Sequence, residues 1–226
     1  MAIRDDILAL DAVIFDLDGT LINSPEAYYK VVQTAFASLG LPPVSRKTLY
    51  HAASDSDFNW DEVLPDEGSA GKEDLIGKIR AVIQEIIPQV FPKEVRMIDG
   101  AADTLKEIAG AGLKIGIVTS SPKKLLEKKW FPLRESGVDG LVGAIITPDD
   151  VIARKPDPEP LMVCVKALGA SLERSVYVGD TCGDMRAGKA AGMKTVGVLT
   201  GFATYDALKK EGPDLILESV AGLISC

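Results

Sequence analysis

From Asp99 onward, short apolar runs alternate with segments of helical periodicity, and this alternation constrains the fold more than any other feature. The apolar runs cover residues 113–118, 143–146, 175–178, 195–198 and 214–217. Helical segments near 101–111, 123–136, 159–168 and 184–191 separate them. Strands that alternate with helices in this way form βαβ units around a parallel sheet. The sequence therefore predicts an α/β fold.

A long block with only helical patterns separates the first strand from the others. Ala12–Phe15 is a continuous apolar run and predicts a buried strand. Helices are expected after it near 24–39, 46–53 and 72–87. Pro88 and Pro92 are expected to end the last of them. We therefore expect a Rossmann-like, three-layer, parallel-sheet core that is interrupted by an inserted, all-helical cap domain. The predicted limits are 1–22 and 97–226 for the core and 23–96 for the cap.

Composition argues against several classes of partner. The formal net charge of −8 disfavours binding to the phosphate backbone of nucleic acids. No apolar run approaches the roughly 20 residues of a membrane-spanning helix, and the N-terminus lacks a signal-peptide core. The three cysteines match no disulfide or zinc framework. We expect a cytoplasmic monomer or homodimer without nucleic-acid or membrane partners.

Two carboxylates follow the first strand directly. Asp16 and Asp18 are two residues apart, so both can approach one ligand. In open α/β sheets, ligands bind outside the carboxyl ends of the strands. Paired carboxylates repel each other unless a cation or a shared proton compensates them. The pair therefore indicates a hard metal ion, a covalent nucleophile with an acid/base partner, or both.

The ends of the later strands also carry polar residues. Thr119 and Ser120 stand before a predicted helix, where hydroxyls and free backbone N–H groups can bind a phosphate. Lys155 lies on a proline-containing loop, and Asp180 and Asp184 follow the strand near 175–178. Four carboxylates, a hydroxyl site and a lysine at one sheet edge suit phosphoryl transfer with Mg²⁺, which takes oxygen ligands.

In order along the chain, these segments resemble the four motifs of the haloacid dehalogenase superfamily. The matched residues are Asp16-Leu17-Asp18-Gly19-Thr20-Leu21, Thr119, Lys155-Pro156, and Gly179-Asp180-Thr181 followed by Asp184. The helical insert between the first two motifs is similar to the C1-type cap of phosphoglycolate phosphatase-like members. The resemblance implies Mg²⁺-dependent hydrolysis of a small phosphorylated metabolite through an aspartyl-phosphate.

The resemblance also implies a role for each matched acid. Asp16 would be the nucleophile and a ligand of Mg²⁺. Asp18 would be the general acid/base, and its backbone carbonyl would reach the metal. Asp180 would bind the metal, and Asp184 would bind it directly or through water. The presence of Asp18 favours phosphate-ester chemistry over dehalogenation or phosphonate cleavage.

The remaining matched residues would bind the phosphoryl group. Thr119 would do so together with Ser120 and nearby backbone amides. Lys155 would pair with both the nucleophile and the phosphate. The cap carries no motif, so the sequence does not name the substrate. Phe58 and Trp60 are interpreted there as packing residues of a minor core, with a substrate-facing role as the less favoured alternative.

Two other functions remain open from the sequence. A sugar phosphomutase of the β-phosphoglucomutase type keeps both aspartates, but its relatives usually carry histidine where this chain has Tyr28. A phospho-accepting signalling module also combines acids, Thr and Lys on a parallel sheet. Such modules are about half this length and lack a large helical insert, so this function is disfavoured.

Overall fold

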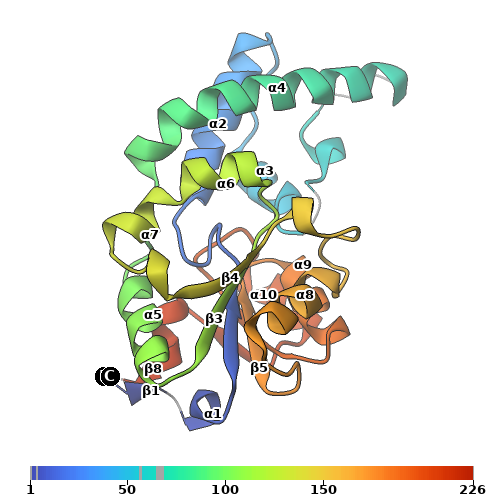
Figure 1. The fold of residues 1–226 in the computed structure, drawn as a ribbon. Coiled ribbons are helices and arrows are strands. Elements are labelled where there is room, and N and C mark those ends of the chain that lie inside the picture. The colour runs from blue at the N-terminus through green and yellow to red at the C-terminus, as the bar shows by residue number, and fades with distance from the viewer. Residues whose placement is uncertain (1, 4, 56–57, 65–68, 226) are drawn as a thin grey trace.

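A six-stranded parallel sheet forms the centre of the protein (Figure 1) in a computed structural model that describes residues 2–3, 5–55, 58–64 and 69–225. Its strand order is β4-β3-β2-β5-β6-β7. The strands are β2 (Ala12–Phe15), β3 (Lys114–Val118), β4 (Val142–Ile146), β5 (Ser175–Gly179), β6 (Lys194–Val198) and β7 (Leu215–Leu217). The first strand in the chain, β2, lies between β3 and β5. The predicted parallel α/β sheet is thus confirmed.

Helices cover both faces of this sheet and give it three layers. In β2, Val13 and Phe15 point into one cluster of buried side chains, which includes Leu105 of α5. Ala12 and Ile14 point into a second cluster, which α8 and α9 complete. This is the alternation expected of a strand that is buried on both faces. The helices are α5 (Ala101–Gly110), α8 (Glu159–Leu168) and α9 (Cys182–Ala190).

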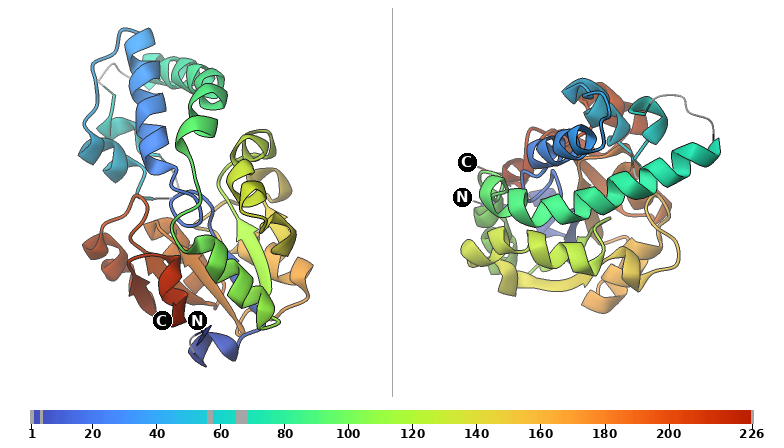
Figure 2. Two further views of the ribbon diagram at one scale, coloured as in Figure 1. Left: turned by 90° about the vertical axis from the view of Figure 1, so that its left-hand side faces the viewer. Right: turned by 90° about the horizontal axis from the view of Figure 1, so that it is seen from above.

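Smaller elements complete the core. They are α1 (Asp5–Leu8), α6 (Lys123–Lys129), α7 (Phe131–Glu135), α10 (Tyr205–Glu211), the 3₁₀ helices η2 (Asp139–Leu141), η3 (Pro148–Asp150) and η4 (Val220–Leu223), and the antiparallel pair of β1 (Ala2–Ile3) and β8 (Ile224–Ser225). The pair of β1 and β8 lies at the end of the molecule opposite the helical insert (Figure 2). Among the described residues, no helix has both the length and the apolar character needed to cross a membrane.

The block between β2 and α5 is a helical insert. Its elements are α2 (Pro25–Ser38), α3 (Arg46–Ala52), the 3₁₀ helix η1 (Trp60–Glu62) and α4 (Ser69–Glu94). They pack around a hydrophobic cluster of their own and lie above the edge of the sheet where the carboxyl ends of the strands lie (Figures 1 and 2). We call Pro25–Glu94 the helical insert; the exact limits of 22/23 and 96/97 between two domains stay a prediction.

The two chain segments that join the insert to the core run side by side. Ile22 and Met97 form an isolated antiparallel bridge. The backbone N–H of Asn23 donates to the carbonyl of Arg96 at 3.0 Å, and the Arg96 N–H donates to Asn23 Oδ1 at 2.7 Å. The insert also reaches the core farther along, because the Cys182 N–H donates to the carbonyl of Ser54 at 3.0 Å.

The predicted end of the third insert helix is wrong, because α4 continues through both prolines to Glu94. Pro88 and Pro92 are exposed, so water can satisfy the carbonyls that lose their hydrogen bonds to these residues. The neighbouring Ile87 and Phe91 are fully buried, one helical turn apart. Burial of this apolar face therefore outweighs the cost of the prolines.

The helix predicted near 123–136 is two helices, α6 and α7, which meet at Trp130. Pro132 lies at the start of α7. Its ring removes a backbone donor and clashes with the carbonyl four residues earlier, so one continuous helix is disfavoured. The break matters for the site, because it ends α6 at Lys129.

Candidate active site

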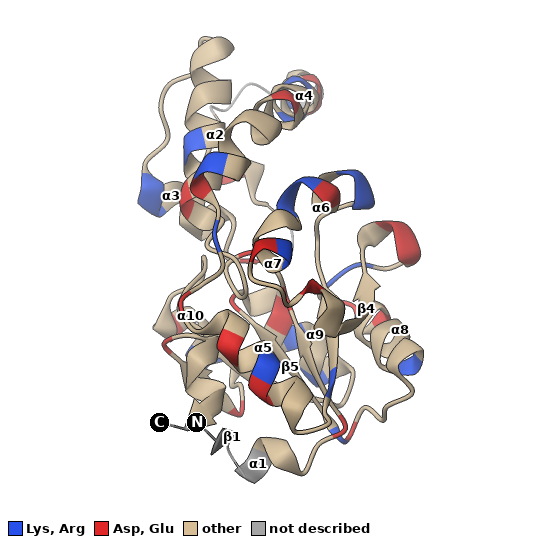
Figure 3. Cartoon of the chain, turned by 60° about the vertical axis from the view of Figure 1, so that its left-hand side comes forward, with Lys and Arg blue, Asp and Glu red and all other residues tan. Residues whose placement is uncertain are grey.

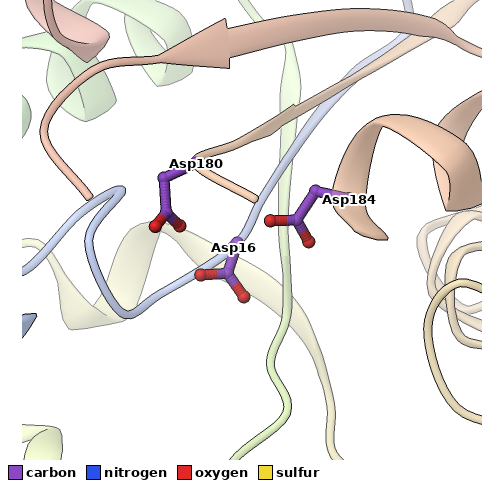
Figure 4. Close-up of side chains that lie close together, drawn as sticks. All are labelled: Asp16, Asp180 and Asp184. Atoms are coloured by element: carbon purple, nitrogen blue, oxygen red, sulfur yellow. The ribbon is translucent and has the colours of Figure 1, made fainter. Parts of the chain in front are cut away.

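Three buried aspartates meet at the carboxyl edge of the sheet (Figure 4). Asp16 directly follows β2, Asp180 directly follows the neighbouring β5, and Asp184 lies in the first turn of α9. One carboxylate oxygen from each lies within 4.8 Å of the others. The side chains are aimed at a common space between the strand ends and the helix. The structure thus brings together three of the four acids that the sequence singles out as metal ligands.

This cluster holds more negative charge than its immediate surroundings neutralise. Burial, together with the charges of Asp184 and Asp18, raises the pKa of Asp16 to about 7 despite the nearby Lys155. Burial and the charges of Asp16 and Asp184 raise the pKa of Asp180 well above its usual range. Buried carboxylates that repel one another in this way need a cation or a shared proton. Their oxygen atoms are the ligands that hard divalent cations prefer, so the residues fit a metal such as Mg²⁺.

The loop after β6 holds Asp180 in place, and sequence reasoning missed this loop. The Phe202 N–H donates to Asp180 Oδ2 at 2.9 Å, and Thr20 Oγ1 donates to Asp180 Oδ1 at 3.2 Å. A Cβ atom on Gly201 would lie only 1.8 Å from Asp180 Oδ2. Glycine is therefore required at position 201, where the backbone passes against the carboxylate.

Lys155 connects two of the three acids. Its Nζ donates to Asp16 Oδ1 at 2.8 Å and to Asp184 Oδ1 at 2.7 Å, and it lies 3.0 Å from the hydroxyl of Tyr177. Burial alone would lower the pKa of Lys155, but the charges of Asp16 and Asp184 outweigh it and hold the pKa well above its usual range. Lys155 is therefore a permanent, fixed cation beside Asp16.

Asp184 has hydrogen bonds at both of its oxygens. Oδ1 accepts from Lys155 and, at 2.8 Å, from the Tyr177 hydroxyl. Oδ2 accepts from the N–H of Thr181 at 3.1 Å and from its hydroxyl at 2.7 Å. Burial would raise the pKa of Asp184, but Lys155 and these donors lower it instead. With two donors on each oxygen, the carboxylate has no lone pair left for a metal unless a bond breaks.

Asp18 lies in a separate group that a second buried lysine organises. Lys129, the last residue of α6, is fully buried and donates to Asp18 Oδ2 at 2.7 Å. It also donates to Ser121 Oγ at 2.7 Å and to the hydroxyl of Tyr28 on insert helix α2. Ser121 in turn donates to Asp18 at 3.1 Å. These contacts fix the Asp18 carboxyl and connect it to the insert.

Sequence reasoning missed Lys129, although a signal for it exists. Most of α6 is basic (Figure 3), and Lys124 and Lys128 are exposed. Lys129 follows the half-buried Leu125 by four residues and therefore lies on the same, inward face of the helix. Burial alone would lower the pKa of Lys129, but Asp18 and Tyr28 raise it above its usual range.

The hydroxyl residues after β3 differ in their contact with the cavity. Ser120 and Ser121 line the cavity that also contains Asp16 and Asp18. Thr119 is buried outside this lining, and its Oγ1 accepts from the Ser121 N–H at 3.1 Å. Of the two residues predicted to bind phosphate at this strand end, Ser120 faces the cavity directly and Thr119 supports the loop.

A cavity of about 290 Å³ lies between the core and the helical insert. Asp16, Asp18, Lys155 and Asp184 line its core side. Side chains of the insert line the opposite side, including Phe58 and Trp60, which the sequence suggests as packing residues. Both rings also pack at the edge of the insert's own hydrophobic cluster. They therefore pack within the insert, as interpreted from the sequence, and also line the cavity.

Comparisons with known proteins agree with this geometry. A family model described as haloacid dehalogenase-like hydrolase matches residues 13–198. The chain is 32% identical to pyrophosphatase PpaX of Bacillus pumilus over 216 residues, 96% of this chain and 95% of that protein. It is 28% identical to the phosphoglycolate phosphatase of Yersinia pestis over 218 residues, 96% of this chain and 92% of that protein.

Solved structures share the fold. A crystal structure described as a predicted phosphoglycolate phosphatase from Haemophilus somnus superimposes with a TM-score of 0.81. The match covers 95% of this chain and 96% of that one at 21% sequence identity. At this identity the likeness concerns the fold, that is, a parallel-sheet core with a helical insert.

Proposed function

The chain belongs to the haloacid dehalogenase-like hydrolase family, and we propose that it is a Mg²⁺-dependent phosphatase that hydrolyses a small phosphorylated metabolite through an aspartyl-phosphate. The observation that carries this proposal is the grouping of Asp16, Asp180 and Asp184 beside the fixed cation Lys155, with Asp18 at the same cavity. A nucleophile, an acid/base group and an anion-binding lysine are thus available to one substrate.

Asp16 is the proposed nucleophile. Lys155 binds its Oδ1, which leaves Oδ2 to attack the phosphorus atom. The new bond joins Oδ2 to phosphorus as the bond to the leaving oxygen breaks, and Asp18 gives that oxygen a proton. Water then attacks the phosphorus, Asp18 takes the proton back, and inorganic phosphate leaves as Asp16 is restored. Two easier displacements replace one difficult step.

Asp16 and Asp180 are the proposed carboxylate ligands of Mg²⁺, with the backbone carbonyl of Asp18. When bound, the ion supplies positive charge to the phosphoryl oxygens. We propose that Asp184 acts on the metal through water, because both of its oxygens already have two donors. Its main task is then to hold Lys155 in place.

We propose that Lys155 and Ser120 contact the phosphoryl group. Lys155 is already buried beside the nucleophile, and Ser120 is exposed at the cavity wall. Thr119 contributes through the Ser121 amide that it holds. The positive charge of Lys155 stabilises charge on the transferring group, which is the main task of a protein in phosphoryl transfer.

Phosphate release from a panel of phosphomonoesters, with and without Mg²⁺, tests the proposal. The panel includes 2-phosphoglycolate and pyrophosphate, for which the relatives are named. We expect Asp16→Asn to lower release by at least about 10³-fold, because the covalent route is lost. Asp206→Asn, an exposed aspartate on α10, is the matched control and should keep wild-type activity.

Three outcomes would contradict the assignment. Unchanged turnover in Asp16→Asn would show that Asp16 is not the nucleophile. Isomerised sugar phosphate without net release of phosphate would indicate the phosphomutase. A phospho-protein that persists for hours would indicate a signalling module.

A further inference from the structure

The cavity at the catalytic acids is polar at its core end and mostly apolar elsewhere. Its apolar wall includes Val32 of α2, Leu49 of α3, Ile83 of α4, Trp60 of η1, Phe58 just before η1, and Phe202 of the core. Each described α-helix of the insert contributes a side chain to this wall. The part of a substrate that extends away from its phosphoryl group therefore meets mainly carbon atoms.

Aromatic rings make up much of this wall. The rings of Phe58 and Trp60 lie 4.6 Å apart between centroids and are tilted by 56°. Both are half-buried, so part of each ring remains uncovered by protein. On the core side, Phe202 packs against Tyr28 at 6.3 Å and against Tyr50 at 5.4 Å. Such rings favour apolar or aromatic ligand groups.

No free positive charge lines the cavity among the residues that the structure describes. Lys155 is the only basic side chain in its wall, and Asp16 and Asp184 hold it. Lys129 is fully buried behind the wall and paired with Asp18. Both lysines thus form ion pairs with the catalytic acids at the core end of the cavity.

The basic residues of the insert are directed elsewhere. Ion pairs join Arg46 to Glu26, Lys72 to Asp61, Lys30 to Glu94 and Lys78 to Asp74. Arg80 is exposed and lies over the Trp60 ring, 5.8 Å from its centroid. None of these five lines the cavity, and neither do Lys47, His51 and Lys93, the other basic residues of the described insert. The six insert residues outside the described part, 56–57 and 65–68, contain no Lys, Arg or His.

The wall instead carries a further negative charge. Asp55 lines the cavity and bonds Arg186 of α9. Arg186 also bonds Glu211 at 2.8 Å. A carboxylate or second phosphate on the leaving group would approach Asp55, Asp16 and Asp18, and the described wall offers it no basic side chain besides Lys155. Desolvation of an unpaired anion is costly, and like charges repel.

We propose that the substrate is the phosphate monoester of an uncharged, predominantly apolar alcohol or phenol, which water converts into that alcohol and inorganic phosphate. This inference rests on the proposed phosphatase function and specifies the leaving group of the same site. It distinguishes this protein from an enzyme for phosphoglycolate or pyrophosphate, whose leaving groups are anions.

An isosteric pair of substrates tests the leaving group. Isobutyl phosphate and 2-phosphoglycolate have the same shape, because the isopropyl end of one replaces the carboxylate of the other. We expect kcat/KM to be about 10–100-fold higher for isobutyl phosphate. Benzyl phosphate should be better still, because its ring can pack on Phe58 and Trp60. An equal or higher kcat/KM for 2-phosphoglycolate would overturn the inference.

A binding experiment gives an answer that does not depend on turnover. Titration of the Mg²⁺-loaded protein with 3-methylbutylphosphonate and with 3-phosphonopropionate compares the same two end groups on inert analogues. We expect the Kd of the apolar phosphonate to be at least about tenfold lower. Tighter binding of the carboxylate analogue would contradict the proposal. If neither phosphonate binds and neither ester releases phosphate, the phosphatase function itself fails, and the inference with it.

A charge-introducing variant links the preference to the wall. Phe58→Arg places a cation at the cavity, so the ratio of kcat/KM for isobutyl phosphate over 2-phosphoglycolate should fall at least about tenfold. Tyr205→Arg is the matched control, because Tyr205 is an exposed aromatic on α10 outside the cavity. An unchanged ratio in a folded Phe58→Arg protein, judged by circular dichroism, would show that the wall does not select the substrate.

Discussion

Lys129 is the residue on which the position of Asp18 depends. It is fully buried, and its Nζ contacts Asp18, Ser121 and Tyr28 at once. The ammonium also lies 4.5 Å from the centroid of the Tyr28 ring and 5.3 Å from that of Phe91. One side chain thus fixes the proposed acid/base group and binds two residues of the helical insert to the core.

We expect Lys129→Met to reduce both stability and activity. Methionine is unbranched like lysine but carries no charge, so it leaves the Asp18 carboxylate without its cation. The free energy of unfolding should fall by about 3 kcal/mol. The kcat should fall on the order of 10²-fold, because Asp18 is no longer held in place. Lys128→Met, one residue earlier and exposed, should change neither quantity. Denaturant unfolding and phosphate release measure the two effects, and full activity in Lys129→Met would remove Lys129 from the site.

The acids and Lys155 could be predicted from the sequence, whereas Lys129 and Gly201 were missed. The predicted residues follow strand ends, and parallel strands bring their carboxyl ends to one edge whatever the loops do. Lys129 contacts Asp18 because it is buried at the end of the short helix α6. The position of this helix end depends on the break at Trp130. Gly201 acts through a close backbone approach to Asp180, which no local pattern records.

At the level of elements, strands were easier to predict than helix ends. The strands of the sheet are short apolar runs, and β2 and β5 at its centre are buried throughout, so their identity follows from their residues. The end of α4 instead depends on tertiary packing, because the buried Ile87 and Phe91 keep the helix going past Pro88 and Pro92. Local propensity favours a stop there, and packing overrides it.

Because packing holds α4 together despite its prolines, Pro88 itself is expected to weaken the helix. In Pro88→Ala the helix gains a backbone hydrogen bond and loses a steric clash, while the unfolded chain gains some freedom. The free energy of unfolding should rise by about 2 kcal/mol, as measured by urea denaturation. Because Pro88 is exposed and outside the cavity, kcat should stay unchanged. A less stable Pro88→Ala protein would mean that the helix depends on a bend at this proline.

At the scale of the whole molecule, the acid cluster links stability to pH and to metal. The pKa of Asp16 is raised to about 7, and that of Asp180 is also raised. In an unfolded chain an aspartate has a pKa of about 3.9. Between these values the folded protein therefore binds more protons than the unfolded chain. Stability from Asp16 is full below about pH 4 and is lost as pH rises through about 7, and the raised pKa of Asp180 acts in the same direction.

Thermal unfolding with EDTA and with Mg²⁺ checks this linkage. We expect the Tm of the metal-free protein to fall between pH 5.5 and pH 8.5. Mg²⁺ binds the ionised carboxylates, so it should raise the Tm by several degrees at pH 8.5 and by little at pH 5.5. At each pH, subtracting the Tm with EDTA from the Tm with Mg²⁺ cancels the contribution of titrating groups outside the acid cluster. A larger effect of Mg²⁺ at pH 5.5 would contradict the assignment of a metal to these acids.

Asp16 is the residue proposed to carry the phosphoryl group during turnover, and this covalent intermediate can be trapped. Asp18→Asn should slow release of phosphate about 10²–10⁴-fold, because the acid/base group is lost, and so help the intermediate accumulate. Protein quenched during turnover is treated with borohydride, which reduces an aspartyl-phosphate to homoserine, and is then digested for mass spectrometry. We predict homoserine at position 16. Homoserine at Asp18, Asp180 or Asp184, or none at all during measurable turnover, would contradict the account.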